Sequence, residues 1–478
     1  MRKQKLKSAT QRRPHKGYTA GFIKKTCLHL IPALLWMSVA QSQSKEDLIA
    51  ASQAGASPLF FHVDAANVPL ITISDFKNEQ ECTVRNGLPN FFHKVRTGKT
   101  VTAGFIGGSI TQGAVCYRPQ TAKYLQSMFP EVPLKALNAG VSGTGADLGA
   151  CRLYDQLLQY RPDLVFVEFA VNGAYAPGME GIIRQIWKFD PNIDICLIYT
   201  INNGQSKIYA EGDIPANIQR LEKVAAHYGV PSIHLGMEAA MLEKAGKLLW
   251  KHSGGESGKI VFSNDGTHPV MAGGNLYAAA IGRGMQEMKQ RQTPVQHTLP
   301  SPLYADNWED ATMFAPQDLA NFSSDWQKTA PIKQFAPWFP YMMQASTPGA
   351  FLTFRFNGTA FGLFTIGGPE AGQLSITVDG QPFTLSGKPL AGTRIFQAGD
   401  QALLNLFNHY CNNRYRGQYD LIAVEPGDHT VTIQLSPEKA DKVKILGERQ
   451  QDDITQHPEK YDRTVVYLGK ILLKGRKL

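Results

Sequence analysis

Between about residues 100 and 290, short apolar runs alternate with longer segments of helical spacing. Runs rich in Val, Ile and Phe that alternate with helices are typical of a parallel sheet covered on both faces. We expect five such strands, near residues 101–106, 134–138, 164–169, 194–200 and 231–235. Because α/β units place their ligand sites at the carboxyl ends of the strands, the residues that follow these strands are the first candidates for chemistry.

The segment 213–228 shows the helical spacing well. Apolar residues recur on one face of this segment: Ile214, Ile218, Leu221 and Ala225. Asp213 can cap the amino end, and Gly229 can end the helix. The pattern therefore predicts an amphipathic helix over these residues.

The pattern changes after Met288, where Gln-Arg-Gln-Thr-Pro and then Leu-Pro-Ser-Pro form a polar, proline-bearing linker. At 478 residues the chain exceeds the usual size of one domain. We therefore predict a signal peptide, an amino-terminal segment of extended structure packed on one of the domains, an α/β domain and a β-rich accessory domain. These parts are residues 1–40, 41–96, 97–292 and 293–478, respectively.

Beyond the linker, hydrophobic positions alternate with period two, as in residues 351–356. Asp379-Gly380 is a tight-turn signal that follows residues 375–378. Pro426-Gly427-Asp428 separates two further apolar runs and is a second hairpin candidate. An antiparallel β-sandwich-like domain is the expected result.

The net charge of +9 is confined to the amino-terminal leader. The first 40 residues hold nine Lys and Arg and no Asp or Glu, which leaves 40 basic against 40 acidic residues in the rest of the chain. A neutral body offers no electrostatic footprint for a phosphate backbone, and no zinc-finger or RNA-recognition pattern is present. We therefore expect no nucleic-acid partner.

The basic leader precedes a short apolar run, Cys27 to Ala40, which ends in small residues before Gln41. This order is typical of a cleavable secretory signal. The run is shorter than the ~20 apolar residues of a spanning helix and includes His29 and Pro32. We expect a secreted or periplasmic protein with no stable membrane span after cleavage.

Cleavage would leave an odd number of cysteines: Cys82, Cys116, Cys151, Cys196 and Cys411. None forms a C-x-x-C pair, which disfavours structural zinc and thioredoxin-type redox chemistry. At least one thiol stays unpaired in a monomer, and one disulfide remains possible.

A serine follows the first predicted strand and two glycines. Gly107 and Gly108 let the backbone turn tightly, so Ser109 can present its hydroxyl to solvent and its amide to a substrate oxyanion. Gly-Gly-Ser is commoner in plain turns and helix caps, so this motif indicates catalysis only together with partner residues.

The segment Asp265-Gly266-Thr267-His268-Pro269 can supply both partners. A carboxylate and an imidazole three residues apart on one turn can converge on the same nucleophile, and of the 12 histidines only His268 follows an Asp by three. A triad needs a base that takes the serine proton and a carboxylate that orients this base. Alternatively, Asp265 caps a helix from residue 270 onward. No third His or carboxylate cluster accompanies the pair, so we expect no metal site.

Four blocks then fall in the order of the SGNH (GDSL-like) hydrolases, a family that the sequence resembles over about residues 100–290. The blocks are Gly107-Gly108-Ser109, Asn138-Ala139-Gly140-Val141-Ser142-Gly143, Val171-Asn172-Gly173, and Asp265 to His268. The resemblance implies a flavodoxin-like three-layer α/β/α domain with a parallel sheet. It also implies a nucleophile, a base and an orienting carboxylate, which are Ser109, His268 and Asp265. The implied oxyanion donors are the Ser109 and Gly143 amides and the Asn172 side chain.

Two residues depart from the family pattern. Gly108 stands where the family usually has the Asp of its GDS signature, and Gly173 stands where an Asp commonly follows the oxyanion Asn. Neither replaced residue makes or breaks bonds, so the departures concern loop geometry and substrate choice. The G-x-S-x-G elbow of α/β-hydrolases does not fit, because position 111 is Thr.

The resemblance implies an esterase that forms an acyl-enzyme on Ser109 and needs no cofactor. Export, a neutral surface and an appended β-rich domain favour O-acetyl or similar esters on polysaccharide, as in the carbohydrate esterases of this family. The substrate would be an acylated carbohydrate or another small ester. Two alternatives remain open: a glycan O-acyltransferase, and a non-catalytic glycan-binding protein that retains the fold.

Aromatic residues of the second domain are candidates for sugar binding. They are Trp308, Trp326, Trp338 and those of the run from Asn408 to Tyr415. More often such residues pack in the core or at strand edges, so this assignment is the weaker alternative.

Overall fold

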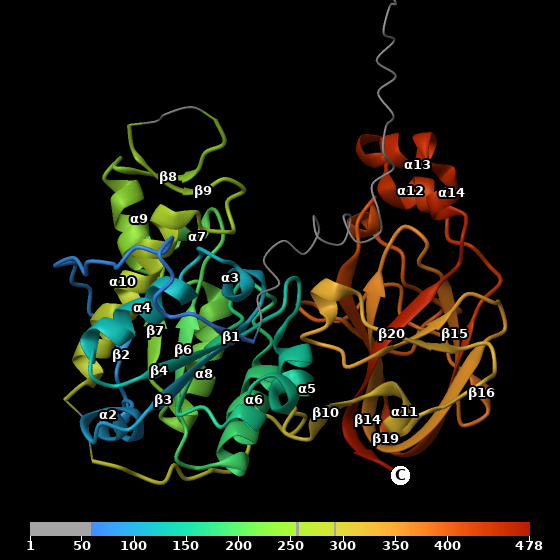
Figure 1. Cartoon of the computed structure of the whole chain (residues 1–478), viewed down its shortest axis with the longest axis horizontal. Coiled ribbons are helices and arrows are strands. Elements are labelled where there is room, and N and C mark those ends of the chain that lie inside the picture. The colour runs from blue at the N-terminus through green and yellow to red at the C-terminus, as the bar shows by residue number, and fades with distance from the viewer. Residues whose placement is uncertain (1–58, 255–257, 291–292) are drawn as a thin grey trace, which may run out of the picture. The chain divides into compact units, whose positions relative to one another are not determined.

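The computed structural model describes residues 59–254, 258–290 and 293–478. The predicted signal peptide, its cleavage site and the first part of the amino-terminal segment lie outside these residues. Within them, Figure 1 shows a sheet flanked by helices in the first part of the chain and a β-rich region in the second.

The parallel part of the first sheet consists of the five predicted strands. They are β3 (Val101–Gly107), β4 (Leu134–Gly140), β5 (Leu164–Glu168), β6 (Asp194–Tyr199) and β7 (Ser232–His234). They pair in parallel in the order β4-β3-β5-β6-β7, which is the flavodoxin-like order. Every residue of β5, β6 and β7 is buried, as expected for a parallel sheet covered on both faces. The predicted fold class is therefore confirmed.

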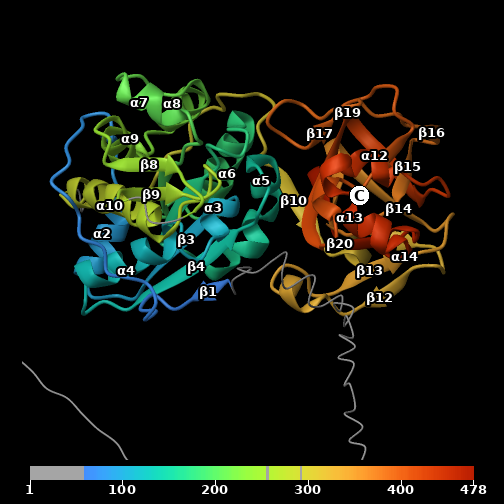
Figure 2. The ribbon, with the colours of Figure 1, turned by 90° about the horizontal axis from the view of Figure 1, so that it is seen from above.

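Helices cover this sheet. They are α2 (Pro89–Arg96), α3 (Ser109–Gln112), α4 (Arg118–Met128), α5 (Ala146–Gln156), α6 (Ala176–Phe189), α7 (Gln205–Ala210), α8 (Ala216–Tyr228), α9 (Met237–Lys244) and α10 (Met271–Met288). Helix α4 packs on α10, and α6 packs on both α5 and α8. Figure 2 shows these two groups on opposite faces of the sheet, which completes the three layers.

Helix α8 confirms the apolar face but not the predicted cap. Ile218, Leu221 and Ala225 are buried, and Gly229 ends the helix with φ +65°. The helix begins at Ala216, and no side chain caps it. The physical reason is Pro215, which disfavours helical backbone at the residue before it and so separates Asp213 from the helix.

The amino-terminal segment is extended only in part. Strand β1 (Phe60–Phe61) pairs antiparallel with β4, and β2 (Cys82–Thr83) pairs antiparallel with β7. Helix α2 was not predicted; it begins at Pro89, a position that suits the first turn of a helix. A small parallel pair, β8 (Leu248–Lys251) with β9 (Ile260–Ser263), precedes the Asp265 block.

The second sheet is antiparallel except for the pair β17 with β19. Its strands are β10 (Ala311–Phe314), β11 (Asn321–Phe322), β12 (Gln327–Thr329), β13 (Met342–Ala345), β14 (Phe351–Gly367), β15 (Gln373–Val378), β16 (Gln381–Pro382), β17 (Ile395–Phe396), β18 (Leu403–Asn405), β19 (Arg416–Leu435) and β20 (Val466–Lys477). Short helices accompany them: α11 (Pro316–Leu319), α12 (Lys442–Leu446), α13 (Asp452–Gln456) and α14 (Pro458–Tyr461). Part of this domain packs around a hydrophobic cluster of its own, whereas other residues, such as Trp338 and Tyr467, join the cluster of the α/β domain.

The period-two pattern in residues 351–356 is confirmed, because alternate residues from Leu352 to Phe356 are buried. The Asp379-Gly380 turn is confirmed as well: both residues have positive φ and connect β15 to β16. The second predicted hairpin is wrong, because β19 runs through Pro426 without turning back. The pairing of β14 with β19 shifts register there: Gly427 pairs with Gly358 and Ala423 with Ala360, so Pro426 lies in a bulge, where a missing N–H donor is tolerated.

The cysteines and tryptophans pack in the interior. All five cysteines of the described chain are free thiols, and only Cys82 is not fully buried. Trp308, Trp326 and Trp338 are at most 8% exposed, so they are core residues and offer no open face to a sugar.

Candidate active site

Ser109 lies where the sequence predicts it, just past the carboxyl end of β3. Strand β3 ends at Gly107, and Ser109 opens the short helix α3. A β-carbon on Gly107 would lie 2.6 Å from the backbone oxygen of Glu168, so this turn requires a glycine. The half-buried serine is thereby fixed in backbone position at the edge of the sheet.

The structure brings Ser109, His268 and Asp265 together. His268 Nε2 lies 2.7 Å from Ser109 Oγ, and His268 Nδ1 lies 2.6 Å from Asp265 Oδ2. A serine, a base and a carboxylate in this order can take the serine proton and stabilise the resulting imidazolium. The three side chains thus have the geometry of a charge relay.

Asp265 orients the loop that carries the histidine. Its Oδ1 accepts hydrogen bonds from the backbone amides of Thr267 and His268, each 2.8 Å long. Partial burial acts to raise the pKa of Asp265, but the hydrogen bonds from His268 and Thr267 outweigh it and hold the pKa well below its usual range. The carboxylate is therefore ionised at neutral pH. Helix α10 begins at Met271 without a side-chain cap, so the alternative of Asp265 as a helix cap is wrong.

Two residues that follow β6 and one residue of β8 hold this loop in place. The backbone amide of Asn203 donates to the Gly266 carbonyl at 2.9 Å, and Trp250 Nε1 donates to the same carbonyl at 3.1 Å. The Thr267 hydroxyl donates to Asn202 Oδ1 at 3.2 Å. Sequence reasoning missed these contacts, although Asn202 and Asn203 follow a predicted strand and could have been considered for that reason.

The predicted oxyanion residues lie at the same edge. Asn172 follows β5, and its side-chain amide packs directly on Gly108, next to Ser109. Its Oδ1 atom is buried without a hydrogen-bond partner among the described residues. Gly143 follows β4 in a turn with φ +72°, and this turn begins where the Val141 amide donates to Gly107. The turns after β3, β4 and β5 thus carry all the predicted donors.

Close packing explains both departures from the family pattern. A β-carbon on Gly108 would collide with the Asn172 side chain, so an Asp does not fit there with Asn172 in this position. Gly173 has φ +85°, and a β-carbon on it would collide with the backbone of Gly392 in the second domain. Glycine at both positions therefore allows close contacts on either side of Asn172.

Two buried charged residues support the site, and sequence reasoning missed both. Glu168 accepts hydrogen bonds from the hydroxyls of Thr200 at 2.6 Å and Thr111 at 3.0 Å, and burial raises its pKa. Arg152 donates to the carbonyls of Gly107, at 2.8 Å, and Ala139. These bonds tie together the strand ends on which Ser109 depends. Charged residues inside otherwise apolar segments are the signal that could have identified them.

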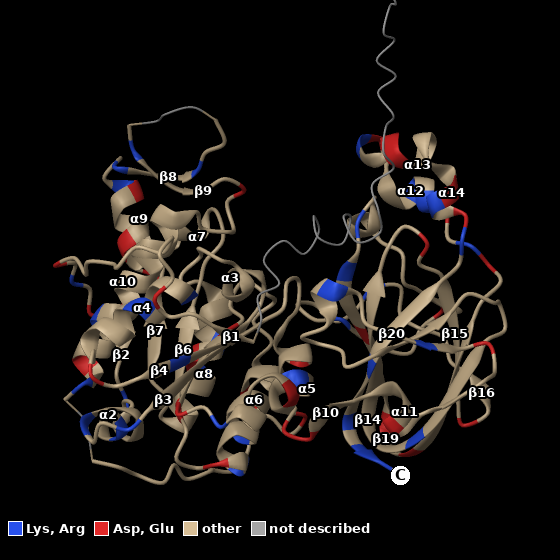
Figure 3. Cartoon of the chain, viewed as in Figure 1, with Lys and Arg blue, Asp and Glu red and all other residues tan. Residues whose placement is uncertain are grey.

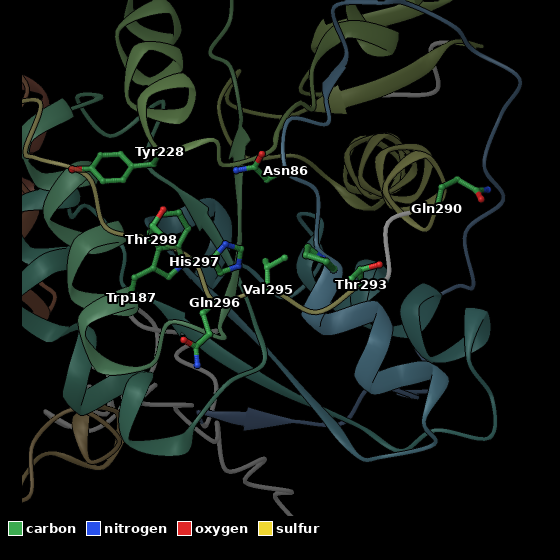
Figure 4. A pocket seen from close by; sticks show the side chains of 10 residues that line it. Asn86, Trp187, Tyr228, Gln290, Thr293, Val295, Gln296, His297 and Thr298 are labelled. Atoms are coloured by element: carbon green, nitrogen blue, oxygen red, sulfur yellow. The ribbon is translucent and has the colours of Figure 1, made fainter.

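A cavity lies away from the edge of the sheet that carries Ser109. Its volume is about 560 Å³, and Figure 4 shows Trp187, Tyr228 and His297 among its lining side chains. His297 Nε2 lies 2.8 Å from Asp194, the first residue of β6, so the cavity is at the amino ends of the strands. It is therefore remote from the serine.

Further features of the structure concern metal, membrane and nucleic-acid binding. In the part of the chain that the structure describes, no group of three or more His, Cys, Asp or Glu residues could hold a metal ion, and no helix is long and apolar enough to span a bilayer. Basic and acidic residues are interspersed along the ribbon in Figure 3. The absence of a nucleic-acid partner stays a prediction.

Comparison with known proteins identifies the class. Residues 105–275 match the GDSL-like lipase/acylhydrolase family model, a range that includes the four blocks from Ser109 to His268. The α/β domain is therefore a GDSL-like (SGNH) hydrolase domain. By class, such a domain is a carboxylic ester hydrolase. No curated protein matches the sequence.

Two solved structures share the architecture of both domains. One is a two-domain esterase active on acetylated mannans, co-crystallised with mannopentaose; it is 20% identical with a TM-score of 0.60, over 83% of this chain and 99% of that chain. The other is a two-domain esterase active on acetylated mannans, 18% identical with a TM-score of 0.57 and the same coverage. At these identities the likeness shows a common fold.

Proposed function

We propose that the protein hydrolyses O-acetyl or similar O-acyl esters on a polysaccharide through an acyl-enzyme on Ser109. The observation that carries this proposal is the relay from Asp265 through His268 to Ser109, at the edge where Asn172 and Gly143 lie. A serine with its base at 2.7 Å is the arrangement that nucleophilic acyl transfer needs.

In the proposed reaction, His268 takes the proton of Ser109 as Oγ attacks the ester carbonyl. The negative charge that develops on the carbonyl oxygen is stabilised by the amides of Ser109 and Gly143 and by the Asn172 side chain. His268 then protonates the leaving alcohol, which is a sugar hydroxyl. Water, activated by the same imidazole, attacks the acyl-enzyme and releases the acid.

The substrate class is supported by two observations. The solved structures that share both domains with this chain are esterases active on acetylated mannans. The second domain also contacts the turns that hold the proposed oxyanion donors, as Gly392 does at Gly173. An acylated carbohydrate fits an esterase whose site is bordered by a second domain.

Action outside the cytoplasm is part of the proposal. It is supported by the sequence order of the leader, in which basic residues, an apolar run and small residues precede Gln41. Amino-terminal sequencing of protein from fractionated cells tests it. A mature chain that begins near Gln41 outside the cytoplasm supports export, and an intact leader in the cytosol contradicts it.

The experiment that tests the enzyme activity measures acetate release from a panel of acetylated oligosaccharides, with Ser109→Ala as the blank. Release that depends on Ser109 is expected. Parallel reactions with an added acceptor sugar distinguish hydrolysis from acyl transfer, because a transferase would form a new sugar ester. A folded wild-type protein that binds these sugars without releasing acetate would overturn the proposal in favour of a glycan-binding protein.

A further inference from the structure

A second, smaller cavity lies directly beside Gly143. Its volume is about 230 Å³, and apart from Gly143 its lining comes from the second domain, including His409, Tyr410 and Arg416. His409 and Tyr410 belong to the polar and aromatic run from Asn408 to Tyr415, whose aromatic residues are candidates for sugar binding. The α/β domain and the second domain thus form this cavity together.

The guanidinium of Arg416 lies against the oxyanion turn. A β-carbon placed on Gly143 would overlap Arg416 Nη2, so only glycine allows this approach. Gly143 also has φ +72°, a conformation that favours glycine. Because the Gly143 amide is a proposed oxyanion donor, Arg416 lies next to the proposed reacting centre.

Buried hydrogen bonds hold the two sides of the cavity together. The Tyr419 hydroxyl donates to Asp147 Oδ1 at 2.6 Å and accepts from the Gly145 amide at 3.2 Å. The backbone amide of Arg394 donates to Asp147 Oδ2 at 3.0 Å. Asp147 and Tyr419 are both buried. The position of the second domain at this turn is therefore defined by hydrogen bonds to the buried Asp147.

Arg416 is the uncompensated charge of the cavity. The other lining arginine, Arg394, is paired with Asp420, whereas the Arg416 guanidinium makes no hydrogen bond or ion pair with the described residues. Its guanidinium stacks on the Tyr410 ring at 4.5 Å. No Asp or Glu is among the residues that line the cavity. A half-buried guanidinium without a carboxylate partner is suited to bind an anion from solution.

We propose that Arg416 is a substrate-binding residue that recognises a carboxylate of the polysaccharide, such as that of a uronic acid beside the acylated position. This inference rests on the proposed esterase function of Ser109. A guanidinium can hold a carboxylate through two parallel hydrogen bonds, which fixes both position and orientation. The substrate is then an acidic polysaccharide, and its charge places the ester at the oxyanion turn.

The test compares two matched substrates: an acetylated uronic-acid oligosaccharide and the same oligosaccharide after its carboxyl groups are reduced to alcohols. The wild-type enzyme is expected to favour the acidic substrate by about tenfold or more in kcat/KM. Arg416→Gln is expected to lower this ratio to about one. Because the ratio is measured within one preparation, loss of folded protein cancels from it.

Arg414→Gln is the matched control, because Arg414 is exposed and does not line the cavity. It should keep the wild-type ratio. Hydrolysis of p-nitrophenyl acetate by the wild type and by Ser109→Ala tests the esterase function separately. Ser109-dependent hydrolysis without a preference for the acidic substrate, or a preference that persists in Arg416→Gln, would overturn the carboxylate site alone. No Ser109-dependent hydrolysis of any ester would overturn both proposals.

Discussion

His268 Nε2 lies 2.7 Å from Ser109 Oγ, although 159 positions separate the two residues in the chain. The serine comes from the turn after β3, and the histidine comes from the loop between β9 and α10. The fold brings these turns together because both lie at the carboxyl edge of the sheet. The contact predicts that the two side chains act as one unit.

Ser109→Ala and His268→Ala are each expected to abolish most ester hydrolysis, and the double variant should lose little more than either single one. Removal of either side chain already ends the proton transfer from Ser109 to His268, so removal of the second side chain has little further effect. Steady-state kcat/KM for the three variants and the wild type measures this. Losses that multiply in the double variant would contradict a shared step.

Asn172→Ala is expected to lower kcat by roughly a hundredfold or more, about 3 kcal/mol, with KM almost unchanged. The donor acts on charge that exists mainly in the transition state, so ground-state binding changes little. In the structure, Asn172 Oδ1 has no hydrogen-bond partner among the described residues, so the substitution should not lower Tm by much. Kinetics and thermal denaturation on one preparation test this. A folded variant with near-normal kcat would remove Asn172 from the site.

Tyr419→Phe tests whether the second domain supports the oxyanion turn. Loss of the hydroxyl removes its bond to Asp147 and leaves the Gly145 amide without its acceptor. The expected cost is about 1–3 kcal/mol of stability together with a severalfold lower kcat. Tyr415→Phe is the matched control, because this buried hydroxyl of the same domain bonds Glu370 of its own domain. Equal kcat values in the two folded variants would contradict a supporting role.

The buried His234 predicts acid sensitivity of the fold. Burial lowers the pKa of His234 to about 4, with Arg85 acting in the same direction and Glu222 opposing it. In the unfolded chain its pKa is about 6.5, so between these values the unfolded state binds a proton that the folded state excludes. The stability that His234 contributes is therefore fully present above pH 6.5 and is lost as the pH falls toward 4.

His234→Gln removes this titration. Between neutral pH and about pH 4, the wild type should lose about 3 kcal/mol more unfolding free energy than the variant. Urea unfolding at both pH values measures the difference, and carboxylates that titrate in both proteins cancel. Parallel pH dependences would show that His234 is not excluded from protonation in the folded state.

The sheet and the relay could be predicted because local patterns carry them. The five strands are short apolar runs, and Asp265 and His268 share one turn, so their convergence follows from spacing. The blocks around Ser109, Gly143 and Asn172 follow predicted strands whose carboxyl ends must meet at one edge. Prediction of these parts of the structure needs no knowledge of contacts between distant segments.

The contacts of the second domain could not be predicted in the same way. The approach of Gly392 to Gly173 and of Arg416 to Gly143 depends on how two domains pack, which leaves no periodic signal in either segment. The sequence around Pro426 predicts a turn. The partner strand β14 continues past Pro426, however, so the irregularity is a bulge within the strand pair. Whether such a segment forms a turn or a bulge depends on the register between strands that are distant in the sequence.

Mapping of the covalent adduct with a fluorophosphonate probe shows which residue is the nucleophile, which we propose is Ser109. After reaction, proteolysis and mass spectrometry, we expect one labelled peptide, which contains Ser109 and carries the probe on that residue. His268→Ala should label far more slowly, because the serine proton then has no acceptor at 2.7 Å. An active wild-type enzyme that is labelled at another residue, or that hydrolyses acetyl esters while Ser109 stays unlabelled, would show that Ser109 is not the nucleophile.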